Sequence, residues 1–155
     1  MEYQLKAGFE QMDVQAVHEF LSRESYWAKD IPLRLVEESL KNSWCLGAFD
    51  QNGRQAGFAR LITDYTTFAY LADVFVLETH RGQGISKTMM EYIMQEPWVK
   101  NLRRLMLATI DAHGLYQQYG FVPLDKPERF LEISRKDLYG AGEAESSRRG
   151  PEAEI

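Results

Sequence analysis

The residues that most directly suggest chemistry are two closely spaced glycines ahead of a lysine and a threonine, in the stretch THRGQGISKT at residues 79–88. Because glycine has no Cβ, Gly82 and Gly84 would let a backbone loop approach a phosphate group closely. A helical pattern begins at Ile85, so the loop amides and the positive end of the helix dipole would face the same anion. An ordinary strand-to-helix turn explains the spacing about equally well, since short glycine motifs often match by chance.

Two familiar nucleotide-binding loops do not fit this stretch. A nucleoside-triphosphate loop, GxxxxGK[ST], would require glycine where the chain has Arg81 and Ser86. A dinucleotide loop, GxGxxG, meets Lys87 at its third glycine, and arginines stand where an acid should hold the ribose. The loop therefore binds a different phosphate-bearing ligand, or it is only a turn.

Composition and charge limit the classes of protein that remain. The chain has 155 residues, of which 45% are hydrophobic, so we expect one domain with a substantial core. The net charge of -5 argues against a general nucleic-acid binder, which needs a basic face. No basic leader precedes an apolar segment, and no apolar run reaches the roughly 20 residues that span a bilayer. We expect a cytoplasmic protein without a nucleic-acid or membrane partner.

Cysteine and histidine are too few and too scattered for a familiar metal site. Cys45 lies in the apolar run SWCLGAF, which favours a small core residue over a nucleophile. The histidines, His18, His80 and His113, show no ligand spacing. We predict no metal.

Hydrophobic periodicity and turn signals predict alternating strands and helices in one domain, residues 1–139. Strands are expected at residues 3–9, 43–50, 54–64, 66–78, 103–110 and 130–133, and helices at residues 12–24, 33–42, 85–96 and 112–121. Residues 140–155 contain no aromatic residue and one large aliphatic residue, so we expect a disordered tail.

The apolar run of residues 70–77 contains one carboxylate, Asp73. Burial in such a strand removes the carboxylate from water and raises its pKa, which would suit a general base. A buried ion pair with Arg60 on the preceding strand is the alternative, because ion-pair networks also perturb pKa values. The sequence leaves both interpretations open.

Two motifs together resemble the GCN5-related N-acetyltransferases (GNAT). The acyl-CoA signature of that family, [Q/R]xxGx[G/A], is matched by RGQGIS at residues 81–86, with Ser86 in place of the final small residue. The family also carries an AxxLYxxxGF-like segment, which is matched by AHGLYQQYGF at residues 112–121. The asparagine often found three residues before that alanine is Thr109 here.

The resemblance covers about residues 3–135. It implies a mixed α/β fold, with helices on both faces of a central sheet that is splayed between its fourth and fifth strands. It implies an N-acetyltransferase that moves the acetyl group of acetyl-CoA directly to an amine, and it leaves a homodimer open. The acceptor is not identified. A catalytically silent acyl-CoA-binding regulatory module is one alternative, and an interaction domain whose glycine loop is only a turn is another.

The resemblance also implies which residues contact the coenzyme, through the backbone of the fourth strand and through the glycine loop. These residues are Val74, Phe75, Val76, Arg81, Gly82, Gln83, Gly84, Ile85 and Ser86. The backbone amide near Val76 is expected to donate to the oxyanion that develops on the thioester.

Tyr116 matches the tyrosine that many family members use as general acid toward the CoA sulfur, and a phenol is protonated at neutral pH. Tyr119 is its rival, and Asp73 is the candidate base. Asp111 is interpreted as the N-cap of the last helix.

The acceptor pocket is expected where the first two helices connect, at Tyr26 and Trp27. Trp44, Tyr65 and Phe68 are further candidates, although aromatic residues are equally common in cores.

Overall fold

A computed structural model describes residues 2–140 of the chain. Its centre is a five-stranded sheet in the order β1-β2-β3-β4-β5. The strands are β1 (Gln4–Ala7), β2 (Trp44–Phe49), β3 (Gln55–Thr63), β4 (Phe68–Val76) and β5 (Arg104–Leu107). The helices are α1 (Val14–Arg23), α2 (Leu33–Lys41), α3 (Ile85–Gln95), α4 (Pro97–Lys100) and α5 (His113–Gln117). Neighbouring strands are antiparallel except β4 and β5, which are parallel.

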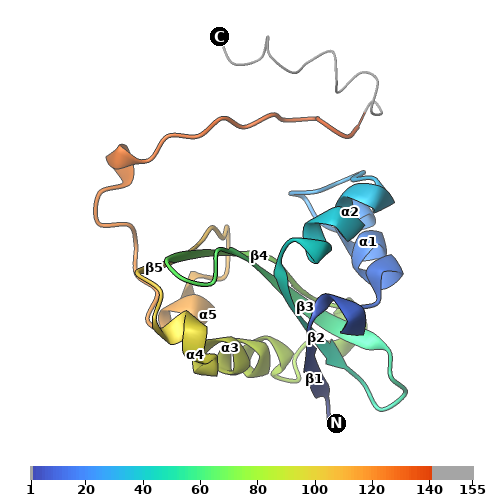
Figure 1. The fold of residues 1–155 in the computed structure, drawn as a ribbon. Coiled ribbons are helices and arrows are strands. Elements are labelled where there is room, and N and C mark those ends of the chain that lie inside the picture. Colours follow the sequence, from blue (N-terminus) through green and yellow to red (C-terminus); the bar gives the residue numbers. More distant parts are fainter. Residues whose placement is uncertain (1, 141–155) are drawn as a thin grey trace.

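Helices cover both faces of the sheet, as the resemblance implies. Helices α1 and α2 lie on one face, and α3, α4 and α5 lie on the other (Figure 1). Each layer has its own apolar core. On the α1 side, the rings of Phe20 and Phe75 stack with centroids 4.0 Å apart. On the α3 side, Met89 and Ile93 pack among buried strand residues such as Leu61.

Local sequence signals explain where the helices begin and end. The Asp13 carboxylate accepts a hydrogen bond from the Ala16 amide at 3.1 Å, which caps α1. Gly84 precedes α3 with φ +79°, a conformation that favours glycine. Pro97 ends α3 and begins α4, because proline cannot donate the amide that would continue the first helix.

The sheet opens between β4 and β5. The two strands pair only over Phe68–Leu71 and Arg104–Leu107, although β4 continues to Val76. The β3–β4 register shifts between Phe58 and Arg60, opposite Asp73, whose φ is +56°. This bulge turns the second half of β4 away from β5. The predicted splay between the fourth and fifth strands is confirmed.

The last predicted strand, at residues 130–133, is wrong. Residues 122–140 form a C-terminal arm without strand pairing, which is interrupted by a single 3-10 turn at Pro127–Arg129 and ends in turns at residues 136–140. The arm passes over the open face of the molecule from β5 towards α2 (Figure 1). A strand requires a partner, and the sequence of residues 130–133 shows only that the segment is apolar and extended. The predicted strand at residues 103–110 is also shorter in the structure, because pairing with β4 ends at Leu107.

Two further expectations concern the tail and the membrane. The predicted disordered tail lies outside the described residues, apart from Gly140. Within residues 2–140, no helix has the length and apolar character needed to cross a bilayer.

Candidate active site

The glycine loop between β4 and α3 has a left-handed backbone at both glycines. The φ angles are +78° at Gly82 and +79° at Gly84, where a side chain would strain the backbone. A Cβ added at either glycine would meet no atom within 4 Å. The glycines are therefore needed for the conformation of the loop, and the space in front of them is open to a ligand.

Side chains on both sides of the loop fix its position. Arg81 Nε donates to the Val76 carbonyl at 3.0 Å, and the Tyr3 hydroxyl donates to Gln83 Oε1 at 3.1 Å. A cavity of about 350 Å³ lies against the loop. Its lining includes the loop glycines, Arg81, Lys87 and the first residues of α3. Two cations and the amides of a helix start suit a diphosphate.

Beyond Leu71, β4 no longer pairs with β5, and the backbone groups on this unpaired edge of β4 are exposed towards the cavity. The Leu77 amide donates to the Ala56 carbonyl on β3 at 2.9 Å. Because successive strand residues point their amides to opposite edges, the Val76 amide points towards the splay. By the same alternation the Val74 amide points the same way. A linear amide-bearing chain could therefore pair with β4 along this edge.

Tyr116 stands on α5 at the edge of the splay. It is 8% exposed, and it lines a cavity of about 490 Å³ between β4 and residues 107–112. Burial raises the pKa of the Tyr116 phenol, and the nearby Asp111 carboxylate raises it further. Tyr116 therefore keeps its proton at neutral pH.

Tyr119 does not lie where a general acid is needed, and Asp111 does not cap a helix. The Tyr119 hydroxyl donates to the Lys87 carbonyl at 3.3 Å, and Tyr119 does not line the cavity of Tyr116. The predicted cap by Asp111 is wrong, because the Ala112 amide donates to Thr109 Oγ1 at 3.0 Å instead. Thr109 thus holds the start of α5.

Asp73 forms a buried ion pair with Arg60, which is one of the two roles that the sequence leaves open for this carboxylate. Arg60 Nε donates to Asp73 Oδ2 at 2.9 Å, and the Asp73 side chain is only 9% exposed. Trp27 Nε1 donates to the other carboxylate oxygen at 2.8 Å. Arg60 also donates to Ser43 Oγ at 3.1 Å. Both oxygens of Asp73 are engaged, and its role as a base stays a prediction.

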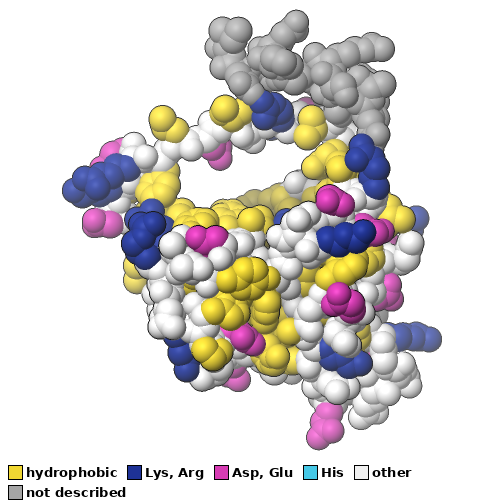
Figure 2. All heavy atoms as spheres, in the orientation of Figure 1, with side chains coloured by type: hydrophobic (Ala, Val, Ile, Leu, Met, Phe, Trp, Pro, Cys, Tyr) yellow, Lys and Arg dark blue, Asp and Glu magenta, His cyan; other side chains and the backbone are white. Residues whose placement is uncertain are grey.

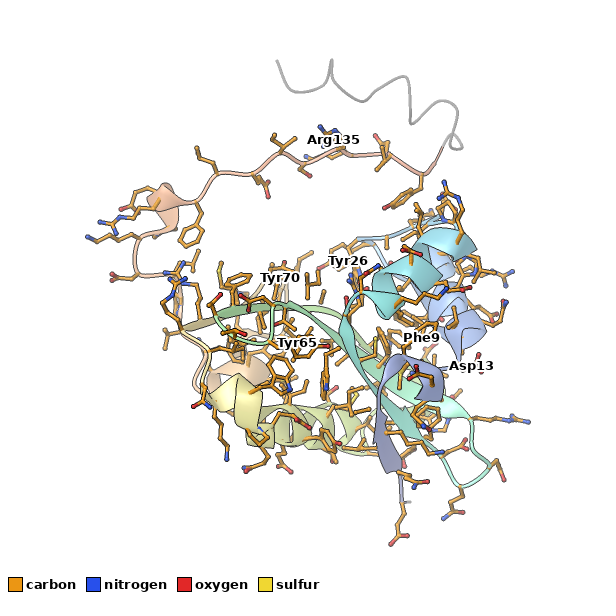
Figure 3. All side chains as sticks on the ribbon, viewed as in Figure 1. Phe9, Asp13, Tyr26, Tyr65, Tyr70 and Arg135 are labelled. Carbon is orange, nitrogen blue, oxygen red and sulfur yellow. The ribbon has the colours of Figure 1, made fainter. Side chains whose placement is uncertain are left out.

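The large cavity beside Asp73 brings the predicted acceptor residues together. Tyr26 and Trp27 line it, with their rings edge-to-face at 5.0 Å, and Tyr26 is 66% exposed. Tyr70 lines it as well, and Figure 3 shows Tyr26 and Tyr70 on the side of the molecule that faces the arm. Tyr70 is not among the acceptor residues predicted from the sequence, although it precedes Ala72 and Val74 at strand spacing.

The other candidate aromatic residues lie elsewhere. Trp44 and Tyr65 both contact the ring of Trp98, at centroid distances of 5.9 Å and 4.9 Å. Neither residue lines the cavity beside Asp73, nor does Phe68. The rings of Trp44 and Tyr65 belong to the side of the sheet covered by α3 and α4.

Cys45 is a core residue, as predicted. Its side chain is fully buried, and burial raises the pKa of the thiol from 9.0 to about 12. We expect thiol reagents to label Cys45 only after unfolding.

The pKa of Cys45 is higher in the folded state than in the unfolded state. The neutral thiol therefore stabilises the fold below pH 9.0, and this contribution falls as the pH approaches 12. The stability difference between the wild type and Cys45→Ala should therefore shrink over that range in chemical unfolding. A difference that does not change with pH would contradict the raised pKa.

Comparison with known proteins gives one family. Residues 14–121 match the model of the acetyltransferase (GNAT) family. A crystal structure from Xanthomonas campestris, provisionally named as a GNAT-family acetyltransferase, is 47% identical and has a TM-score of 0.86. It covers 90% of this chain, which covers 97% of that one.

Two other proteins extend this comparison. A provisionally named acetyltransferase of Gibberella zeae is 32% identical over 68% of this chain and 70% of its own. A Clostridium acetobutylicum protein crystallised with acetyl-CoA shares the fold, with a TM-score of 0.63 at 17% identity over 86% of this chain and 96% of its own. The chain belongs to the acetyltransferase (GNAT) family.

Proposed function

We propose that this protein transfers the acetyl group of acetyl-CoA directly to an amine. The observation that carries the proposal is the open edge of β4. This edge leads from the glycine loop to Tyr116 and to the cavity of about 490 Å³ beside Asp73, which we call the acceptor cavity. A ligand with a diphosphate at one end and a reactive thioester at the other fits this arrangement. The family relationship supports the same cosubstrate.

The residues proposed to hold acetyl-CoA form two groups. The amides of residues 82–86 and the cation of Lys87 would bind the diphosphate, and the backbone of Val74 would pair with the pantetheine arm, while the Val76 amide would contact the thioester. The side chain of Phe75 packs against Phe20 instead, so we assign it a structural part. Arg81 would act through Val76, because it holds the carbonyl of that residue.

The chemistry requires a donor for the developing oxyanion and a proton for the departing thiolate. We assign the first role to the Val76 amide, which points towards the splay. We assign the second role to Tyr116, which is buried and protonated at the cavity wall. Asp73 would hold Trp27 in place. If Asp73 also acts as the base, it must release one of its two hydrogen bonds.

The acceptor proposed here is an amine that arrives as a cation. Tyr26, Trp27 and Tyr70 present aromatic rings to the cavity, and Asp111 adds a carboxylate. Aromatic faces attract cations, and an exposed carboxylate strengthens that attraction. The cavity opens beside exposed Tyr26, so the end of a longer chain would also reach it.

Ligand binding separates the proposed function from its alternatives. Acetyl-CoA at about 100 times its dissociation constant should stabilise the fold by about 2.7 kcal/mol, whereas ATP and NAD should not. A panel of amines should then release CoA thiol from acetyl-CoA. Binding without release on any amine would favour a silent regulatory module, and an unchanged melting temperature would remove the enzyme proposal.

A pair of glycine variants tests the loop itself. Gly84→Ala should weaken acetyl-CoA binding about tenfold, because a side chain at φ +79° disturbs the loop amides. Gly53→Ala is a matched control, since Gly53 also has φ +79° and no atom within 4 Å of its Cβ position, but lies in the β2–β3 turn. Isothermal titration of both variants measures the difference. Equal affinities would show that the loop does not contact the ligand.

A further inference from the structure

The ring of His80 lies beside the glycine loop and is held there by a residue from the start of the chain. The Tyr3 hydroxyl lies 2.8 Å from His80 Nδ1, and it donates to Gln83 Oε1 at 3.1 Å. The rings of Tyr3 and His80 meet edge-to-face, with their centroids 5.7 Å apart. Tyr3 therefore ties His80, which ends the 3-10 turn Glu78–His80, to the glycine loop.

The hydrogen bonds of Tyr3 determine which nitrogen of His80 carries the proton. A phenol has one proton, and the Tyr3 hydroxyl donates it to Gln83. The contact with His80 therefore requires Nδ1–H to donate to the Tyr3 oxygen. In the neutral ring Nε2 then has no proton, so a second proton can be added there without breaking the bond to Tyr3. The same hydrogen bonds thus hold the ring in both of its charge states.

His80 also lines the cavity in front of the glycine loop. This cavity of about 350 Å³ is lined by His80 together with Arg81, Lys87 and the loop glycines. Because Nδ1 is bound to Tyr3, Nε2 is the ring nitrogen that remains for a ligand in the cavity. A protonated Nε2 would donate a charge-assisted hydrogen bond to a phosphate oxygen.

The rest of the protein offers an anionic ligand little general attraction. The chain has a net charge of -5. On the face drawn in Figure 2, Lys and Arg side chains are scattered among Asp and Glu side chains. Electrostatic attraction for a phosphate therefore depends on the cations beside the loop, where one more positive charge has a large effect.

The charged groups around His80 decide when its ring accepts a second proton. Arg81 and Lys87 line the same cavity and, without an anion, oppose another positive charge. The Asp50 carboxylate in the β2–β3 turn interacts with the charge of His80, and Glu78 adds a carboxylate on the same 3-10 turn. A diphosphate in the cavity would reverse the effect of the two cations and favour the protonated ring.

We propose that His80 binds the diphosphate of acetyl-CoA as a cation, and that binding is coupled to the uptake of a proton from solvent at Nε2. Tyr3 is the positioning residue, because it keeps Nδ1 engaged and the ring at the cavity wall. The inference rests on the proposed function for the identity of the ligand, and it concerns binding alone. The affinity for acetyl-CoA should fall as the pH rises through the range in which a histidine loses its proton.

Isothermal titration of the full chain with acetyl-CoA, in buffers of different ionisation enthalpy, counts the protons taken up. An ordinary histidine is mostly neutral at about pH 7.5. The wild type should therefore take up at least about half a proton more than His80→Asn at this pH. Asparagine Nδ2 can replace Nδ1 as the donor to Tyr3, so this variant removes the group that titrates and keeps the hydrogen bond.

His18→Gln is the matched control. His18 Nε2 on α1 donates to the Ile31 carbonyl at 3.0 Å, and glutamine Nε2 can keep this bond. Helix α1 lies on the face of the sheet opposite α3, so the control should take up as many protons as the wild type. Between about pH 6 and about pH 9, the affinity of the wild type should fall about tenfold more than that of His80→Asn.

Tyr3→Phe tests the positioning role. The phenylalanine ring can keep the edge-to-face contact with His80, but the hydroxyl that orients Nε2 is lost. We expect proton uptake below that of the wild type, whereas a merely structural role would weaken binding and leave the proton count unchanged. An unchanged count would overturn the part assigned to Tyr3.

The outcomes for this inference and for the proposed function differ. If the wild type and His80→Asn both bind acetyl-CoA with equal proton uptake, the inference is overturned and the proposed function stands. If the wild type does not bind acetyl-CoA, both are overturned.

Discussion

Replacing Tyr116 by phenylalanine is expected to lower kcat for acetyl transfer about 100-fold, since a positioned general acid contributes at least this much. The dissociation constant for acetyl-CoA should stay within about twofold, because the ring remains in place and only the hydroxyl is lost. Steady-state kinetics and isothermal titration measure the two quantities. An unchanged kcat would remove Tyr116 from the mechanism.

Tyr119→Phe is the matched control for this experiment. Tyr119 lies on the same short segment, and its pKa is also raised, first by burial and then by Glu91. Its hydroxyl, however, bonds to the Lys87 carbonyl and does not reach the acceptor cavity. We expect kcat of Tyr119→Phe to stay within about threefold of the wild type. A larger loss in Tyr119→Phe than in Tyr116→Phe would exchange the two assignments.

The pH profile gives an independent reading of the same assignment. A general acid must be protonated, and burial raises the pKa of Tyr116 above the usual 10.0. The protonated form therefore persists as the pH rises to 10.0, and the loss of kcat caused by Tyr116 should occur only above that value. If kcat of the wild type fell near neutral pH and this fall were lost in Tyr116→Phe, the result would contradict the conclusion that burial raises the pKa of Tyr116.

Asp73→Ala is expected to destabilise the fold by about 3 kcal/mol, because removing one partner of a buried ion pair leaves the other charge uncompensated. Arg60 would lose the carboxylate at 2.9 Å, and its side chain is only 14% exposed. Trp27 would lose its acceptor at 2.8 Å. Chemical unfolding monitored by circular dichroism measures the loss. A change below about 1 kcal/mol would mean that the pair contributes no more than an exposed one.

Two further substitutions separate charge from backbone at this position. Asp73 has φ +56°, which asparagine and glycine also accept. Asp73→Asn keeps the backbone and removes the charge, whereas Asp73→Gly keeps the backbone and removes the whole side chain. If the ion pair dominates, Asp73→Gly should lose nearly as much stability as Asp73→Ala. If Asp73 is the base, Asp73→Asn should also lower kcat for acetyl transfer.

Local signals in the sequence anticipated much of the site. Gly82 and Gly84 stand where the backbone is left-handed, and that conformation is a property of the residue itself. Asp73 could be recognised because a carboxylate is conspicuous in an apolar run. The motif around Tyr116 placed that residue on a short helix, as observed.

Contacts between distant segments could not be read in the same way. The hydrogen bond between Trp27 and Asp73 joins a helix connection to β4 across 46 positions of the chain. Tyr70 lies in the four-residue stretch of β4 that pairs with β5, and it lines the cavity that opens where the two strands diverge beyond that stretch. Nothing in the residues around Tyr70 signals that divergence.

The sequence by itself determined the family, the glycine loop and the residue types that could perform the chemistry, because each depends on short segments and on backbone preference. Tertiary structure decided which carboxylate oxygen meets Arg60, which aromatic rings surround the acceptor cavity, and where residues 130–134 lie. The physical reason is that an apolar extended segment has the same composition whether or not it pairs with a strand. Only its place in the fold decides, and residues 130–133 meet no partner strand within residues 2–140.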